Sequence, residues 1–142
     1  MPNPEDNNTL LIKAASEGNA AEVRRLIPIS DPKGKGGDAM AWAARFGHTQ
    51  CVELLIPVSD PKAWGSEALR WAVENGRTQC MEVLYPFSDP VVALQRLQIK
   101  FPDDYRKWGQ LRDMVEAEQL NATLHKEIEN TNNVNIQKKQ KI

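Results

Sequence analysis

Short segments with a helical hydrophobic pattern, interrupted by glycine and proline, occupy the first two thirds of the chain. Over residues 67–75, apolar side chains recur three and four positions apart, the spacing of one helix face. Gly76 follows, and an achiral residue can end a helix in the left-handed conformation at no steric cost. A second helical pattern covers residues 78–85 and stops at Pro86, which cannot continue a helix. The pattern predicts two short helices joined by a glycine turn.

This pair of helices recurs every 29 residues. The tripeptide Ser-Asp-Pro ends each copy, at residues 30–32, 59–61 and 88–90. The same step relates a glycine, an alanine, a leucine and a proline in each copy: Gly18, Gly47 and Gly76; Ala14, Ala43 and Ala72; Leu26, Leu55 and Leu84; Pro28, Pro57 and Pro86. A fixed step of this length is typical of a stacked solenoid, which buries its core between units and leaves one long face free to bind.

Residues 9–100 resemble the ankyrin repeat family. The family pattern places a Leu, two Ala, Gly-His, two apolar residues and a Leu pair in this order. The second and third copies match it, with Arg77 in the place of His: Met40, Ala43-Ala44, Gly47-His48, Cys51-Val52 and Leu54-Leu55, then Leu69, Ala72-Val73, Gly76, Cys80-Met81 and Val83-Leu84. The resemblance implies an all-α fold, a short helical solenoid of helix-turn-helix repeats.

The repeats depart from the family in length. An ankyrin unit usually has 33 residues, four more than this one. The missing residues fall at 57–66, a stretch too short and proline-rich for the family's β-hairpin finger. The Thr-Pro before the first helix is replaced by Asp38-Ala39 and Glu67-Ala68. Such short units look like those of bacterial or phage ankyrin-like proteins.

The expected organisation is a leader, a repeat array, a helical cap with a long terminal helix, and a tail. Residues 1–8 form the leader, and the units cover about 9–37, 38–66 and 67–90, with a partial capping unit at 91–100. Glu22 and Arg25 stand where later units carry apolar residues, as expected of a first unit with a polar outer face. A cap helix is expected over 101–128, and residues 129–142 are too polar to pack, so we expect them to be disordered.

Two apolar stripes lie on nearly opposite sides of the long helix. One contains Tyr105, Trp108, Leu111, Val115 and Ala122, and is expected to cap the stack. The other contains Ala117, Leu120, Leu124 and Ile128, and has no obvious neighbour in a monomer. Either the helix breaks near Asn121 and folds back, or it protrudes and meets a partner. The protruding form would suit a weak homodimer or a partner-binding helix.

Composition limits the partners and the compartment. The chain has 142 residues, enough for one domain, and a formal net charge of −1, which gives no general field for nucleic acid or an anionic membrane. No apolar run approaches the roughly 20 residues that span a bilayer, and no signal segment opens the chain. We therefore expect a cytoplasmic protein that contacts neither nucleic acid nor membrane directly.

Candidate chemistry is sparse. Cys51 and Cys80 occupy equivalent positions about one helix diameter apart, beyond disulfide reach, and are expected to be reduced core residues. His48 stands at the ankyrin Gly-His position, where the resemblance implies hydrogen bonds between units. Residues 33–37 contain three glycines but lack the phosphate-loop pattern. We therefore expect no catalytic residues, no metal and no cofactor.

The resemblance implies contact positions in the turn before the first helix and at the end of that helix. Carried over, these are Lys35 in the second unit, Lys62 and Trp64 in the third, and the helix ends Arg45, Phe46, Glu74 and Asn75. Phe46, Arg45 and Trp64 would form one aromatic and guanidinium patch. Trp64 either binds a partner or folds back on its own unit. Trp42 and Trp71 occupy equivalent positions and are expected to be core.

The function that follows is a non-enzymatic protein–protein interaction module that binds through the repeat face. The rival is a small inhibitor or effector, encoded by a phage or a bacterium, that blocks an enzyme or a nucleic-acid machine by surface binding.

Overall fold

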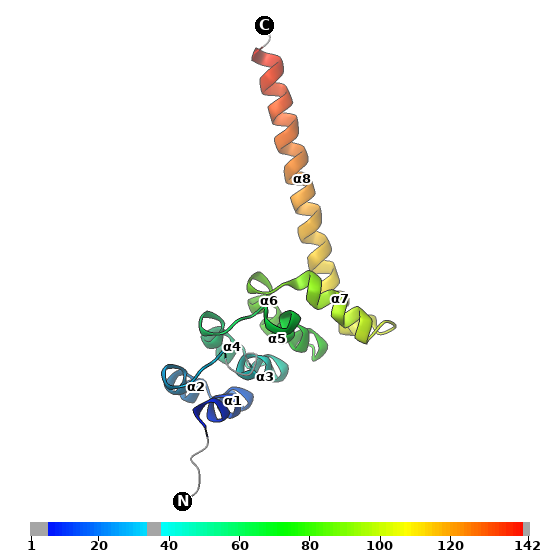
Figure 1. Cartoon of the computed structure of the whole chain (residues 1–142). Coiled ribbons are helices and arrows are strands. Elements are labelled where there is room, and N and C mark those ends of the chain that lie inside the picture. Colours follow the sequence, from blue (N-terminus) through cyan, green and yellow to red (C-terminus); the bar gives the residue numbers. More distant parts are fainter. Residues whose placement is uncertain (1–5, 34–37, 141–142) are drawn as a thin grey trace, which may run out of the picture.

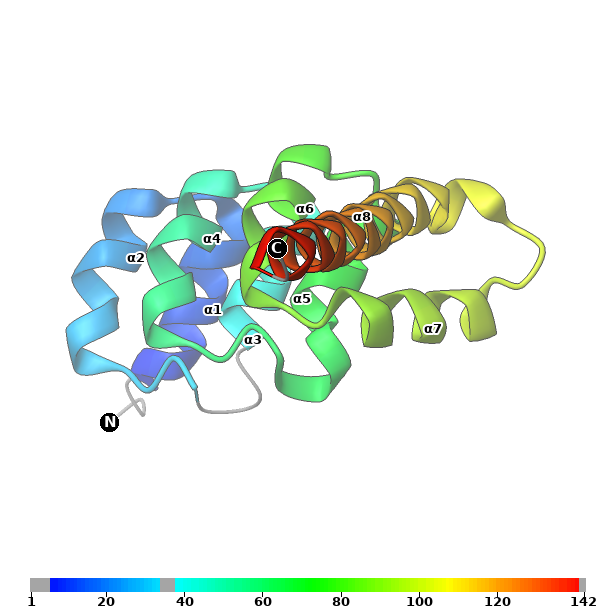
Figure 2. The same cartoon turned by 90° about the horizontal axis from the view of Figure 1, so that it is seen from above.

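The computed structural model describes residues 6–33 and 38–140, and every regular element within them is a helix. Three pairs stack in order: α1 (Asn7–Glu17) with α2 (Ala20–Leu26), α3 (Asp38–Phe46) with α4 (Thr49–Leu55), and α5 (Ala63–Glu74) with α6 (Thr78–Leu84). Figures 1 and 2 show the first helices of the pairs in one layer and the second helices in another. The predicted all-α solenoid is confirmed.

The core runs along the stack, between the two layers and between successive units. Leu26, Leu55 and Leu84, one from each unit, are each 0% exposed. The facing side of the first helices is built from small residues at equivalent positions, among them Ala14, Ala43 and Ala72. Small side chains let neighbouring helices approach closely, so the repeated alanines set the spacing of the units.

Each second helix ends in a 3-10 turn with proline as its central residue. These turns are η1 (Ile27–Ile29), η3 (Ile56–Val58) and η4 (Tyr85–Phe87). Proline has no N–H and cannot extend an α-helix, so the α-helix gives way to a 3-10 turn. The chain then leaves the layer of second helices at each Ser-Asp-Pro.

The start of α5 is a left-handed turn. Trp64, Gly65 and Ser66 have φ values of 56°, 67° and 57°, so the right-handed helix begins at Glu67, as the sequence predicted. Arg70 Nη2 and Nε donate to the carbonyls of Trp64 (3.1 Å) and Gly65 (3.2 Å) and hold the turn. Ser66 is fully buried, and its Oγ accepts a hydrogen bond from Asp89 N at 2.7 Å.

The first unit closes in the same way, which corrects the predicted leader. α1 begins at Asn7, with Asp6 as its N-cap. Asn8 Oδ1 accepts a hydrogen bond from Asp31 N at 2.7 Å. This bond is the equivalent, in the first unit, of the bond between Ser66 and Asp89 in the third. Asn7 Nδ2 donates to Ile29 O at 3.1 Å. Residues 7 and 8 therefore belong to the first unit, because their polar side chains satisfy the backbone of its last turn.

The stack ends on α7 (Pro90–Lys100), η5 (Tyr105–Lys107) and the first turns of α8 (Gly109–Gln140). Leu94 and Leu97 of α7 and Leu111 and Val115 of α8 are buried in the common core. Beyond Val115, α8 leaves the stack and projects from it as a single straight helix (Figure 1).

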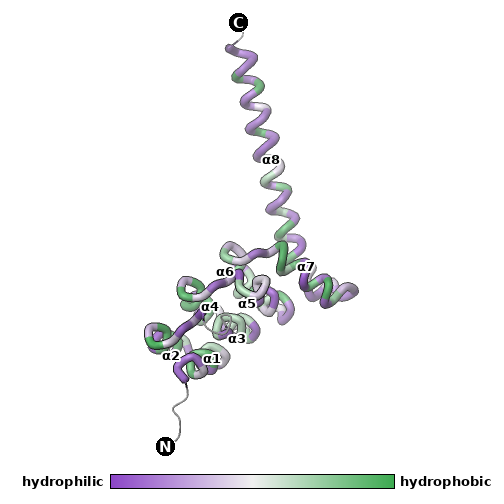
Figure 3. Tube along the Cα trace, viewed as in Figure 1, coloured by the Kyte–Doolittle hydropathy of each residue, from purple (hydrophilic) through white to green (hydrophobic). Residues whose placement is uncertain are grey.

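Three expectations for the C-terminal part are corrected. The long helix begins at Gly109 and not at the start of the expected range 101–128, because the chain first turns through η5. It does not break near Asn121, so the fold-back alternative is wrong. Residues 129–140 are helical, although exposed and mostly hydrophilic (Figure 3). An existing helix extends by one local hydrogen bond per residue, so it needs no apolar contacts to continue.

Ser66 offers a test of the left-handed turn. Ser66→Ala removes the acceptor of the part-buried hydrogen bond from Asp89 N, and we expect the free energy of unfolding to fall by about 0.5–1.5 kcal/mol in urea titrations. Ser66→Gly loses the same bond but adopts the positive φ without steric cost, so its loss should be smaller. Thr123→Ala, which removes an exposed hydroxyl from α8, serves as the control and should be near neutral. A glycine variant less stable than the alanine variant would contradict this account.

Candidate functional site

A ladder of hydrogen bonds joins the C-terminal ends of the first helices to the following units. His48 Nε2 donates to Ser16 O at 3.0 Å, Arg77 Nε to Arg45 O at 3.1 Å, and Lys107 Nζ to Glu74 O at 3.1 Å. The last carbonyls of a helix have no partner within it and carry partial negative charge, so donors from the next unit are favourable there. The ladder fixes the backbone of the residues that carry the candidate site.

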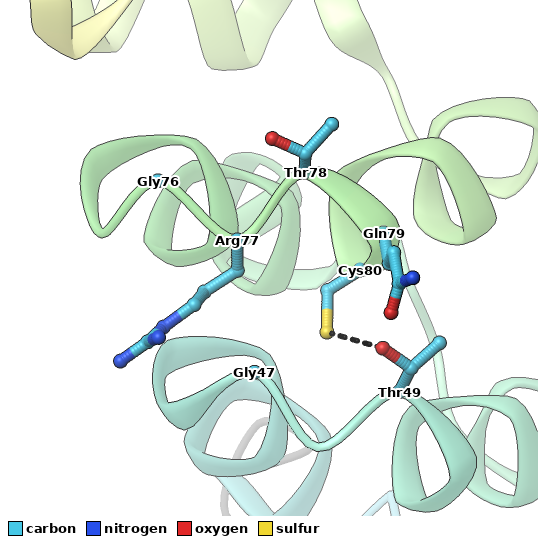
Figure 4. A pocket seen from close by; sticks show the side chains of 7 residues that line it. All are labelled: Gly47, Thr49, Gly76, Arg77, Thr78, Gln79 and Cys80. Carbon is cyan, nitrogen blue, oxygen red and sulfur yellow. Dashed lines mark hydrogen bonds between the residues drawn. The ribbon is translucent and has the colours of Figure 1, made fainter.

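Glycine is required where the ladder passes. Gly18 has φ +76° and Gly47 has φ +81°. A Cβ at Gly18 would lie 2.5 Å from His48 Nδ1, and one at Gly47 would lie 2.9 Å from Arg77 Cδ. Figure 4 shows Gly47 beside the arginine that crosses from the next unit. These glycines allow both the left-handed helix end and the passage of the bridging side chain.

Three aromatic rings and one guanidinium lie at the ends of α3 and α5. Trp42 stacks on Phe46 (5.7 Å between centroids) and meets Trp71 edge-on at 5.4 Å. The Cζ of Arg45 lies 5.1, 5.7 and 5.2 Å from the ring centroids of Trp42, Phe46 and Trp71. Among the described residues, the Arg45 guanidinium has no ion-pair partner and no hydrogen-bond acceptor.

A hollow of about 170 Å³ adjoins this cluster. Its walls are Arg45, Trp71, Glu74, Asn75 and Lys100. Lys100 Nζ lies 3.1 Å from both carboxylate oxygens of Glu74, so this acidic group is already paired. We call Trp42, Arg45, Phe46, Trp71, Glu74 and Asn75 the aromatic face.

The structure brings together four of the residues expected from the sequence. Arg45, Phe46, Glu74 and Asn75 all lie in the aromatic face. Trp42 and Trp71, expected to be core, are partly buried and meet between the second and third units, and Trp71 packs against the buried core. Their equivalence at a step of 29 residues was the signal that placed them side by side, but it could not say that the pair lies at the edge of the layer.

Trp64 and Lys62 are not part of this cluster. They lie at the N-terminal end of α5, before the right-handed helix begins at Glu67, whereas Trp71 lies near its C-terminal end. Trp64 is 66% exposed, so it does not fold back on its unit. Lys35, the equivalent of Trp64 in the second unit, lies outside the described residues. The expected patch of Phe46, Arg45 and Trp64 therefore divides between the two ends of the helices.

The candidate groups for chemistry have structural roles. Cys51 and Cys80 are free and buried, and burial raises the pKa of both thiols. Cys80 lies 3.5 Å from Thr49 Oγ1 in a polar hollow between the second and third units (Figure 4). In the described ranges, no three His, Cys, Asp or Glu side chains gather as metal ligands, and no helix is long and apolar enough to cross a membrane.

Comparison with known proteins agrees with the architecture. A family model described as ankyrin repeats matches residues 11–93 in three copies. Neither the curated proteins nor the solved structures give a match.

The glycines of the ladder give a matched pair of substitutions. Gly76→Ala puts a Cβ into open space, so it should cost only the left-handed strain of about 1–2 kcal/mol. Gly18→Ala adds a clash with the His48 ring and should cost more in thermal or urea unfolding, because the ring must leave Ser16 O. Equal losses at the two positions would mean that the ring contact has no energetic weight.

Proposed function

Because the chain belongs to the ankyrin repeat family, whose repeats are generally protein–protein interaction modules, we propose that it is a non-enzymatic adaptor that binds a partner protein through the aromatic face. The observation that carries the proposal is Arg45, whose guanidinium lies among three rings while its own donors have no acceptor among the described residues. Tryptophan and arginine are the residues most enriched in interface hot spots.

The surroundings of Arg45 support this assignment. Phe46 is 43% exposed beside it, and the adjacent hollow offers the amide of Asn75 and the paired Glu74 and Lys100. An apolar centre with a polar rim is the usual anatomy of a protein interface. The ladder bond from Arg77 to Arg45 O holds the backbone in place, so little order has to be gained on binding.

The rival role of an inhibitor or effector uses the same face. It differs only in what binding does to the partner: an adaptor leaves the partner active, whereas an inhibitor abolishes its turnover. Assay of the captured partner with and without the chain distinguishes the two.

Phe46→Ala tests the aromatic face. It should weaken capture of the partner by about 2 kcal/mol, the scale of an interface hot spot, while the melting temperature changes little. Trp64→Ala, at the other end of α5, is the matched aromatic control and should weaken capture less. Capture is measured by immobilising the chain in a lysate of the native host and quantifying bound proteins by mass spectrometry. Partners retained equally by Phe46→Ala would reject the face.

We propose separately that the exposed side of α8 binds a second helix. Leu120, Leu124 and Ile128 are 60%, 45% and 57% exposed on the protruding part of the helix. Four-residue steps place them on one side, where the same side of another copy, related by a two-fold axis, could cover them. Only three large apolar side chains contribute, so the dimer would be weak.

Substitution of the α8 stripe tests this second surface. Leu120→Asp with Leu124→Asp should shift a dimer to monomer in sedimentation velocity at high protein concentration, because two charges would have to be buried. The melting curve of the repeats should be unchanged, since neither leucine contacts them. A wild-type chain that stays monomeric at every concentration would remove the homodimer and leave only a different partner for the helix.

A further inference from the structure

We propose that the aromatic face recognises an acidic segment of its partner, and that Arg45 receives the carboxylate of an Asp or Glu side chain. This inference rests on the proposed function and adds the chemistry of the partner to it.

The first step is the state of Arg45. A guanidinium carries five N–H donors in a rigid plane that matches a carboxylate with two parallel hydrogen bonds. Here its Cζ lies 5.1–5.7 Å from three ring centroids, and its donors have no hydrogen-bond acceptor within the described part of the chain. Arginine stacked in this way is preorganised, so a carboxylate can bind without first ordering the side chain.

The second step is the local excess of positive charge. Glu74 lies between two hollows: Arg45 and Lys100 border one, and Arg106 and Lys107 border the other, which has a volume of about 510 Å³. Lys100 pairs with the Glu74 carboxylate, and Lys107 binds the Glu74 carbonyl. Arg106 in turn pairs with Asp104 at 3.1 Å. Arg45 and Lys107 thus remain without a carboxylate partner among the described residues, although the whole chain has a net charge of −1. The excess is local and favours an anionic ligand.

The third step separates a protein from a nucleic acid. Cations with aromatic rings also occur where single strands stack and bind through their phosphates. In this face Lys100 is held in an ion pair by Glu74, so it is not free to bind a phosphate in a continuous row. Of the two cations that border this hollow in the described part of the chain, only Arg45 lacks a carboxylate partner, which suits one carboxylate better than a row of phosphates.

The fourth step places the rest of the ligand. Phe46 is exposed next to Arg45, and Lys100 borders the hollow that Arg45 lines. A segment that contacts both must run past Arg45, so we assign the carboxylate to a side chain within the segment and not to a chain terminus. The neighbouring residue over Phe46 should be apolar, because the phenyl ring offers it no hydrogen-bonding group.

The experiment is a peptide selection followed by a thermodynamic cycle. A random 12-residue peptide library is displayed on phage and selected on the immobilised full chain. We expect selected peptides to contain Asp or Glu next to a large apolar residue. One of them is then synthesised with its acidic residue as the acid and as the amide, and both forms are titrated into the wild type and into Arg45→Gln by calorimetry.

The expected result is a coupled loss. Replacing the acid by its amide should weaken binding to the wild type about tenfold or more, the scale of a charge-assisted hydrogen bond. Arg45→Gln should cause a similar loss, and the two changes together should cost little more than either alone, because they remove one interaction. Arg24→Gln, an exposed arginine on α2, is the control and should leave the affinity unchanged. Melting curves of both variants exclude loss of the fold.

Each other outcome overturns the proposal in a distinguishable way. If the selected peptides lack acidic residues but lose binding in Phe46→Ala, the carboxylate proposal is wrong and the proposed function stands. Peptides that bind Phe46→Ala and Arg45→Gln as well as the wild type, or a selection that yields no binder, reject both. Additive losses in the cycle show that Arg45 and the acid act separately. Arg45-dependent binding of a single-stranded oligothymidine, measured alongside, would assign the face to nucleic acid.

Discussion

The unpaired carbonyls at the end of each first helix are the constraint on which the array depends. A helix of nine to twelve residues leaves its last carbonyls without partners, and a stacked unit cannot expose all of them to water. The following unit supplies the donor each time, from His48, Arg77 and Lys107 in turn. The donors differ chemically, but the acceptors are equivalent. The 29-residue repeat therefore keeps the position of the hydrogen bond between units, whereas the side chain that donates it changes.

The same link explains why the candidate site lies where it does. The residue whose carbonyl is bound in the second unit is Arg45, and its side chain starts from a backbone held by Arg77. The next link fixes Glu74 through Lys107. These two hydrogen bonds thus hold the backbone of the cation and of the carboxylate that line the hollow together with Trp71. The C-terminal ends of the first helices therefore contribute both to the stability of the array and to the candidate binding site. Substitutions there should be tested for their effect on both properties.

The sequence predicted elements well where both ends carry a local signal. A helix was predicted over residues 78–85, between Gly76 and Pro86, and α6 covers Thr78–Leu84. The aromatic face was predicted in part, because Arg45 and Phe46 stand out one by one. Trp42 and Trp71 were assigned to the core, and Trp71 does pack against it, but both are only partly buried. Hydrophobic periodicity shows which side of a helix faces inward, but not how close a residue lies to the edge of the layer. Residues 129–140 were expected to be disordered because they have too few apolar residues to pack against the domain. Their helix does not need such packing, since it is held by local hydrogen bonds along the backbone.

The last helix keeps the two exposed surfaces apart. α8 begins beside η5, whose Lys107 reaches the C-terminal end of α5, and Tyr85 at the end of α6 binds Glu118 nine residues further along the helix. Because α5 and α6 run in opposite directions, these contacts lie at opposite edges of the third unit. Nine residues of helix rise about 13 Å, enough to cross the end of the stack. The stripe at residues 120–128 therefore emerges on the side away from the aromatic face. A partner on one surface leaves the other free, so a dimer formed through α8 would carry two aromatic faces, both open to binding.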